Sequence, residues 1–258
     1  MIGRLLDVDR HPISESSYIA ECRGRLDRDG ALVLHGFAQP EIVGQVVTQC
    51  APLQPRAFFA GSTHNVYLTP PDPGLAVDHP FNRQIESSKG LIADDELSVD
   101  SPLRAIYGDE SFRSFLCGVL DIDAVYPYAD DVSSINVHFA SAGQELGWHF
   151  DNSSFAVTML LQPADGGAHF EYVPGVRDAD VGDMAFDRVE RILDGDEPVR
   201  RLEFEAGDLV VFRGRDALHR VTPTEGNTTR LLVVFAYNSE PGVALSASAL
   251  DTFYGRTG

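Results

Sequence analysis

The chain has 258 residues, of which 43% are apolar and 23% are charged, the usual composition of a packed globular protein. Its 20 basic and 39 acidic residues give a formal net charge of −19, which repels nucleic-acid phosphates and anionic lipids and so argues against both as partners. Three scattered cysteines, with neither a secretory signal pattern nor a membrane-length apolar run, predict a cytoplasmic protein without a disulfide framework.

The first 123 residues combine helical and loop-like patterns. Apolar residues at helical spacing predict helices over residues 14–26, from residue 40 onward and over 101–118. An apolar run over residues 31–37 predicts a short strand between the first two helices. Residues 62–100 are rich in Pro, Asp, His and Ser, which predicts ordered loops. This part is therefore expected to support a core that lies further along the chain.

From about residue 124 the pattern changes to short strands separated by turns. The predicted strands are 133–140, 154–162, 168–173, 199–205, 208–214 and 229–238, with one helical interruption over 181–194. Many short strands at regular spacing favour a barrel or a two-sheet jelly roll. We therefore expect an α+β chain forming one domain over residues 1–258, with a helical support (1–123), a β core (124–240) and a C-terminal segment (241–258).

The strongest chemical signal is the sequence Gly-Trp-His-Phe-Asp at residues 147–151. On an extended segment, His149 and Asp151 project to the same side because side chains alternate with a period of two. His219, which follows a predicted strand, could supply a third ligand. Two imidazoles and one carboxylate form the facial triad that binds Fe(II) and leaves coordination positions open for catalysis.

Arg230 begins the last predicted strand. We expect this strand to pair beside the His219 region and to point Arg230 inward, where a guanidinium can bind a carboxylate in bidentate fashion. In a chain with so few cations, an inward arginine requires an anionic partner.

Each of these residues also has a purely structural interpretation. His149 could be a satisfied histidine at a strand start, His219 a turn histidine and Arg230 a surface charge. Their order along the chain, on predicted strands, favours the iron site. His138 and His169 lack matching partners and are expected to be structural.

The series His149-x-Asp151, His219, Arg230 resembles that of the Fe(II)- and 2-oxoglutarate-dependent oxygenases, most clearly over residues 133–238. The resemblance implies a double-stranded β-helix (a jelly-roll, cupin-like fold) and Fe(II), 2-oxoglutarate and O2 as cofactor and co-substrates. It also implies that Arg230 holds the distal carboxylate of 2-oxoglutarate.

The sequence around the motif, including LGWHFDNSSFAVTMLLQ and GDLVVFRGRDALHRV, resembles the BesD-like branch of free amino acid halogenases and hydroxylases. Halogenases of that branch carry Gly or Ala in place of the carboxylate ligand, which leaves a position for chloride. Asp151 retains the carboxylate, so the resemblance implies a hydroxylase that couples C–H hydroxylation to conversion of 2-oxoglutarate into succinate and CO2. A lysine-like or other polar or cationic amino acid is the first candidate substrate.

Six further residues are candidates for substrate binding, and each has a structural alternative. Arg83 could bind a carboxylate or be a surface arginine, and His79 could equally be a loop histidine. Asp130 could meet an amine or lie in a solvated turn. Asn152 stands where lysine halogenases of the branch tend to carry an acid. The remaining candidates, which could instead face solvent or pack in the core, are Glu171 and Tyr254.

Other functions remain open at this stage. The same iron site could perform desaturation or cyclisation, or could act on a carrier-bound or protein-bound residue. A non-redox cupin-like binding module is the alternative of another class, although such a module has no need for an inward Arg230. The expected partner is a small amino acid, and a homodimer is one option for assembly.

Overall fold

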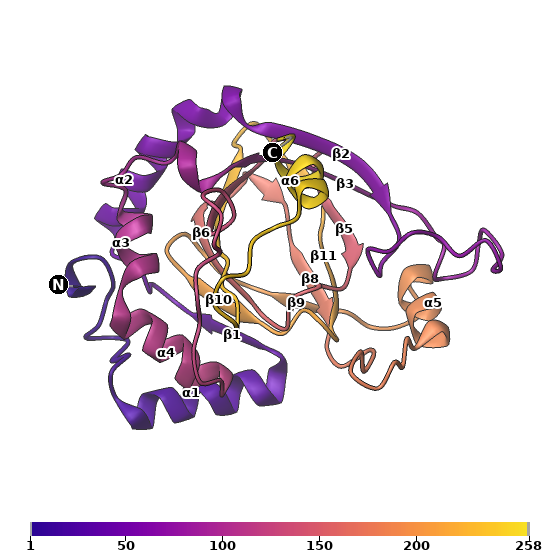
Figure 1. Cartoon of the computed structure of the whole chain (residues 1–258), viewed down its shortest axis with the longest axis horizontal. Helices are drawn as coiled ribbons and strands as arrows, with labels where there is room; N and C mark the ends of the chain where they lie inside the picture. The colour runs from indigo at the N-terminus through magenta and orange to yellow at the C-terminus, as the bar shows by residue number, and fades with distance from the viewer. Residues whose placement is uncertain (1, 257–258) are drawn as a thin grey trace.

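The computed structural model describes residues 2–256, in which one curled antiparallel sheet carries helices along its outer face (Figure 1). The α-helices are α1 (Ser16–Asp29), α2 (Pro40–Cys50), α3 (Pro102–Gly108), α4 (Glu110–Leu120), α5 (Phe186–Asp194) and α6 (Ala247–Tyr254). Three short 3-10 helices are η1 (Ile2–Arg4), η2 (Ala51–Arg56) and η3 (Asp94–Glu96). None of the helices in the described part of the chain is long and apolar enough to span a membrane.

The sheet contains eleven strands, and every pairing in it is antiparallel. Its order is β1-β10-β6-β13-β4-β3-β5-β11-β8-β9, with β2 paired to β3 and a separate pair β12-β7. The bounds are β1 (Ala31–Leu34), β2 (Phe58–His64), β3 (Ile85–Ile92), β4 (Ile135–Ala140), β5 (Leu146–His149), β6 (Ala156–Gln162), β7 (Gly166–Gly167), β8 (Phe170–Val173), β9 (Arg200–Leu202), β10 (Leu209–Phe212), β11 (Leu218–Val221), β12 (Thr224–Glu225) and β13 (Arg230–Phe235). This architecture confirms the predicted α+β jelly-roll class.

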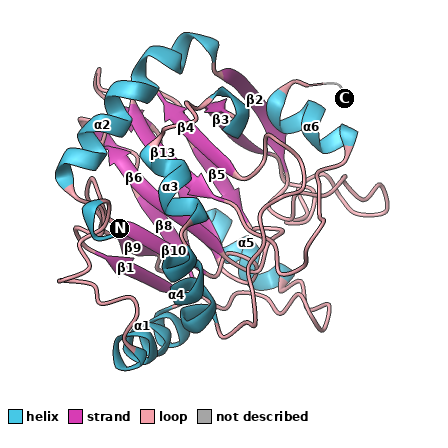
Figure 2. Ribbon diagram, turned by 60° about the vertical axis from the view of Figure 1, so that its left-hand side comes forward, coloured by secondary structure: helices cyan, strands magenta, loops and turns pink. Residues whose placement is uncertain are grey.

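The main hydrophobic core lies between the sheet and helices α1 to α4 (Figure 2). Alternate residues of β4, namely Ile135, Val137 and Phe139, face these helices and are almost fully buried. Helix α4 contributes Phe112 and Phe115, which are also fully buried. Because strand side chains alternate, the residues between these apolar positions point to the opposite, inner face of the curled sheet.

The sequence predicts only loops over residues 62–100, but strand β3 lies within this segment and β2 ends in it. β3 joins β4 to β5 in the middle of the sheet. The sequence of β3, IESSKGLI, has no regular apolar alternation, because several of its side chains line a polar interior. The predicted helix over 101–118 is divided into α3 and α4 at Asp109, whose side chain accepts a hydrogen bond from the Phe112 backbone and caps α4.

Candidate metal centre

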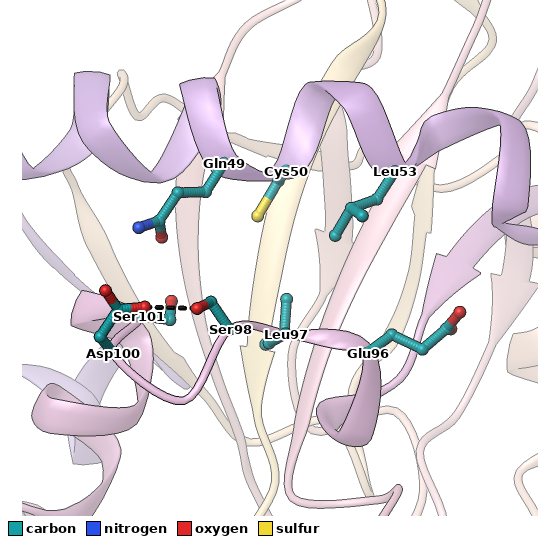
Figure 3. Close-up of a pocket in the computed structure, with 8 residues that line it drawn as sticks. All are labelled: Gln49, Cys50, Leu53, Glu96, Leu97, Ser98, Asp100 and Ser101. Atoms are coloured by element: carbon teal, nitrogen blue, oxygen red, sulfur yellow. Dashed lines mark hydrogen bonds between the residues drawn. The ribbon is translucent and has the colours of Figure 1, made fainter.

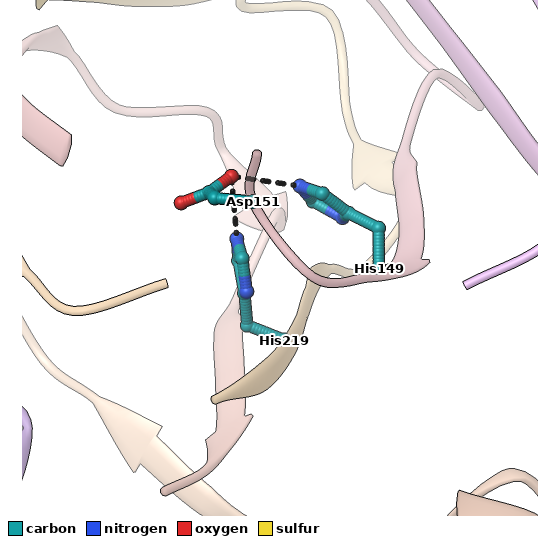
Figure 4. A group of neighbouring side chains, drawn as sticks. All are labelled: His149, Asp151 and His219. Atoms are coloured by element: carbon teal, nitrogen blue, oxygen red, sulfur yellow. Dashed lines mark ion pairs between the residues drawn. The ribbon is translucent and has the colours of Figure 1, made fainter. Parts of the chain in front are cut away.

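The side chains of His149, Asp151 and His219 point toward one another (Figure 4). His149 is the last residue of β5 and lies directly opposite His219 of β11 in the strand register. The Nε2 atoms of His149 and His219 lie 3.6 and 3.5 Å from Oδ1 of Asp151. One ligand atom from each residue falls within 4.8 Å of the others, so the group could hold a metal ion.

The two imidazoles are oriented by the same local contact. Nδ1 of His149 lies 2.8 Å from the Gly147 carbonyl oxygen, and Nδ1 of His219 lies 3.0 Å from the Ala217 carbonyl oxygen. With Nδ1–H donating to a carbonyl, each Nε2 is left as a lone-pair donor, which is the usual arrangement of a metal-bound histidine. Burial, together with the neighbouring His219, lowers the pKa of His149, which favours the neutral form that a metal requires.

The Asp151 carboxylate faces the two imidazoles with Oδ1 and leaves its other oxygen, within the described chain, without a hydrogen-bond partner. Its backbone N–H donates to the Gly214 carbonyl oxygen at 3.0 Å. Its Oδ2 atom is buried and has no hydrogen-bond partner among the residues that the structure describes. Burial raises the pKa of Asp151, but the facing His219 and His149 outweigh it and lower the pKa overall. An ionised carboxylate with a free buried oxygen fits a cation, because a buried charge otherwise remains uncompensated.

Two glycines make room for the triad. A Cβ on Gly214 would lie 1.8 Å from Oδ2 of Asp151, so this carboxylate occupies the space that any larger residue would fill. A Cβ on Gly147 would lie 2.3 Å from the Glu86 carbonyl oxygen, because β3 passes close to β5. The residue types at these two positions are therefore part of the site.

Arg230 lies on the inner face of the sheet, but the strand that carries it has different neighbouring strands from those expected. Its strand β13 pairs with β4 and β6 rather than beside β11, so the expected pairing next to His219 is wrong. The arginine is only 8% exposed, and burial lowers its pKa to about 10. Within residues 2–256 no ion pair with a carboxylate is found for Arg230. A buried guanidinium without a carboxylate fits an anionic ligand.

The candidate substrate residues of the loop before β3 contact helix α5. The Arg83 guanidinium pairs with Asp194 at 2.6 Å (Nη1 to Oδ1). The His79 ring packs edge-on against Phe186, with ring centroids 4.9 Å apart. Tyr67, from the same loop, stacks on Phe150, so this loop and α5 pack against the segment that carries His149 and Asp151.

The other candidates are spread around the sheet. Asp130 accepts hydrogen bonds from the Val132, Ser133 and Leu245 backbone, and although burial opposes it, these bonds lower its pKa. Asn152 is exposed in a bend after the triad. The Tyr254 hydroxyl donates to Oδ1 of Asn136 at 2.8 Å, which connects α6 to the inner face of β4.

Glu171 is buried on the face of the sheet opposite His219. Its register partner is Arg220, the neighbour of His219, and its Oε2 lies 2.8 Å from Nη2 of Arg220. Arg201 approaches its other oxygen at 3.5 Å. Strand alternation therefore places this ion-pair network away from the triad.

Replacing Glu171 with glutamine is expected to lower the thermal unfolding midpoint while metal affinity stays unchanged. The substitution leaves two arginines without their counter-charge, a loss of about 1–3 kcal/mol for charge-assisted hydrogen bonds. Thermal unfolding and metal titration of Glu171→Gln measure the two effects separately. Weakened substrate binding with an unchanged melting temperature would instead assign Glu171 to the substrate.

Two cavities lie outside the triad. One, of about 440 Å³, lies between the end of α2 and the segment after η3 (Figure 3). The other, of about 380 Å³, lies beside α6, and its lining includes Tyr254 and Leu91. Neither cavity is lined by a triad residue or by Arg230.

Sequence reasoning misses two residues. Gly214 stands only as a strand end in the sequence, although it provides the space for Asp151. Lys89 falls in a predicted loop, yet it lies in β3 with its Nζ 3.3 Å from Nδ1 of His138 on the inner face. A usable signal existed for one of them, since Lys89 is the only lysine in the sequence.

The fold is shared with solved 2-oxoglutarate- and Fe(II)-dependent oxygenases. A 2-oxoglutarate–Fe(II) oxygenase-family oxidoreductase from Burkholderia pseudomallei is similar, at 16% identity and a TM-score of 0.51 over 87% of this chain and 92% of that one. The epimerase SnoN from nogalamycin biosynthesis, solved with Fe3+, α-ketoglutarate and nogalamycin RO, is 15% identical. Its TM-score is 0.60 over 86% of this chain and 84% of that one. A prolyl hydroxylase from Trichoplax adhaerens is 13% identical, with a TM-score of 0.54 over 87% of this chain and 90% of that one.

The chain belongs to the halogenase D family, whose model matches residues 88–252. That range includes the three residues of the triad, Arg230 and the strands that carry them. A search of curated protein sequences finds no match.

Proposed function

We propose that the protein is an Fe(II)- and 2-oxoglutarate-dependent hydroxylase of a free amino acid. In this proposal His149, Asp151 and His219 bind iron and Arg230 binds the distal carboxylate of 2-oxoglutarate. The bound iron supplies O2 activation, coupled to oxidative decarboxylation of 2-oxoglutarate to succinate and CO2. A lysine-like or other polar amino acid is the first candidate substrate, on the strength of the sequence resemblance to free amino acid halogenases and hydroxylases.

The observation that supports hydroxylation over halogenation is the carboxylate of Asp151. It faces both imidazole Nε2 atoms, and Gly214 accommodates it without a clash. A carboxylate in the third ligand position leaves no vacated site for chloride on the metal. Hydroxyl transfer to the substrate is then the expected outcome, even though the family is named for halogenation.

The chain's own contribution is to orient the reactants. The two Nδ1 contacts fix the imidazoles, and the buried Arg230 fixes one end of the dicarboxylate by charge-assisted hydrogen bonds. Residues of the loop before β3, such as His79 and Arg83, together with Asn152 after the triad, stay candidates for contacts with the substrate.

The test is a mass-spectrometric screen of free amino acids with the purified protein, Fe(II), 2-oxoglutarate and chloride. We expect one amino acid to gain a single oxygen atom, with formation of an equal amount of succinate. Dominant chlorination would contradict the role given to Asp151. Loss of two hydrogens would indicate desaturation or cyclisation, and turnover only of carrier-bound or protein-bound residues would contradict a free substrate.

A further inference from the structure

The only lysine of the chain lies on the inner face of the sheet. Lys89 belongs to β3, and its Nζ atom lies 3.3 Å from Nδ1 of His138 on β4. His138 faces inward because it alternates with Val137 and Phe139, which pack against the helices. In a protein with 39 acidic residues, the only lysine side chain therefore lies on the inner face of the sheet.

Lys89 and Arg230 stand on either side of one small residue. Arg230 of β13 is the register partner of Ala140 on β4. On the other side of β4, Gly90 of β3 pairs with Phe139, and continuing that antiparallel register places Lys89 opposite Ala140. Directly opposed residues in neighbouring strands point to the same face. The two cations therefore flank a methyl group in one row across β3, β4 and β13.

Within residues 2–256 neither cation forms an ion pair with a carboxylate, and only Lys89 is influenced by one, that of Asp151. Burial lowers the pKa of Lys89 to about 8, with Asp151 opposing the shift and Arg230 adding to it. Burial and the two cations, Lys89 and Arg230, also lower the pKa of His138. A metal ion bound by Asp151 would neutralise the charge of that carboxylate. The row that contains Lys89 and Arg230 would then carry an excess of positive charge, which a bound anion would compensate.

We propose that Lys89 and Arg230 together hold the distal carboxylate of 2-oxoglutarate, with His138 positioning the Lys89 ammonium group. Arg230 supplies a planar pair of donors and Lys89 a point charge, so one carboxylate above Ala140 can contact both. Neutral His138 accepts a hydrogen bond from Nζ of Lys89 and so orients the ammonium group toward the carboxylate. This inference rests on the proposed function, since it assumes that 2-oxoglutarate is the ligand.

The test measures binding rather than turnover. Dissociation constants for 2-oxoglutarate and for pyruvate are determined by calorimetry on the Mn(II)-loaded protein without oxygen. Pyruvate has the same carboxylate and keto group but no distal carboxylate. The variants are Lys89→Met, Lys89→Arg and Arg230→Met, with Arg28→Met as a matched loss of one exposed positive charge.

Lys89→Met should weaken 2-oxoglutarate binding by about tenfold to 100-fold, the effect of one charge-assisted hydrogen bond. Pyruvate binding should not change, Lys89→Arg should restore part of the loss, and Arg28→Met should bind both ligands like the wild type. A normal melting temperature is expected for Lys89→Met, because replacing a buried charge with an apolar chain of similar length seldom destabilises a fold.

Two outcomes separate this inference from the proposed function. Weakened 2-oxoglutarate binding in Arg230→Met, together with unchanged binding in Lys89→Met, would overturn the role of Lys89 and leave the proposed function standing. Unchanged binding in both variants would overturn the proposed co-substrate site itself. If Lys89→Met weakened only the binding of the amino acid substrate, Lys89 would belong to the substrate site and the inference would be wrong.

Discussion

Replacing His219 with alanine is expected to abolish metal binding and, with it, conversion of 2-oxoglutarate to succinate. The imidazole supplies one of three ligands, and the remaining pair, His149 and Asp151, lies only two residues apart and would hold an ion loosely. Loss of a residue that merely orients a ligand already costs about 10- to 100-fold in metal affinity, so loss of a ligand should exceed that. Direct titration with Fe(II) or Mn(II) measures it.

The matched control is His169→Ala, which removes an imidazole close to the same sheet but outside the triad. Metal should raise the melting temperature of the wild type and of this control, because a ligand at 100 times its dissociation constant adds about 2.7 kcal/mol of stability. The melting temperature of His219→Ala should not respond to metal. A wild-type response in His219→Ala would show that the triad does not bind the ion.

The metal site could be predicted because its information is local. His149 and Asp151 lie two residues apart on one extended segment, so alternation indicates a shared side for them. His219 stands out because it follows a strong apolar strand and completes a recognisable set of ligand types. The structure brings these three residues together. The strand that carries Arg230 is as predicted, but its expected pairing beside the His219 region is wrong, because the pairing of β13 with β4 and β6 joins segments far apart in the chain. The periodicity of a strand predicts which face of the sheet a side chain lies on, but it does not predict which strands pair with it.

Strands β2 and β3 could not be predicted for a related reason. A strand is recognised by an apolar face, whereas the inner face of β3 carries Lys89. The polar residues that predict a loop therefore belong to a strand whose inner face carries a buried lysine. Glu171 shows the same limit, since alternation allows either face of the sheet until its pairing with Arg220 on β11 places it on the face opposite His219.

Gly214→Ala is expected to reduce metal affinity by about 10- to 100-fold although Gly214 is not itself a ligand. The new Cβ would lie 1.8 Å from Oδ2 of Asp151, a separation that van der Waals repulsion forbids. Since the Gly214 carbonyl also holds the Asp151 backbone N–H, the main chain has little room to adjust. The carboxylate must therefore rotate away from the two imidazoles, and metal titration should show the loss.

The matched control is Gly44→Ala in helix α2, where an added Cβ meets nothing within 4 Å. That change should leave metal affinity unaltered and raise stability slightly, by about 0.5–1 kcal/mol, because alanine favours a helix interior. Normal metal affinity in Gly214→Ala would mean that Asp151 can move without leaving the ion. In that case the carboxylate would be a flexible ligand, and the argument that it keeps chloride away from the metal would lose its structural basis.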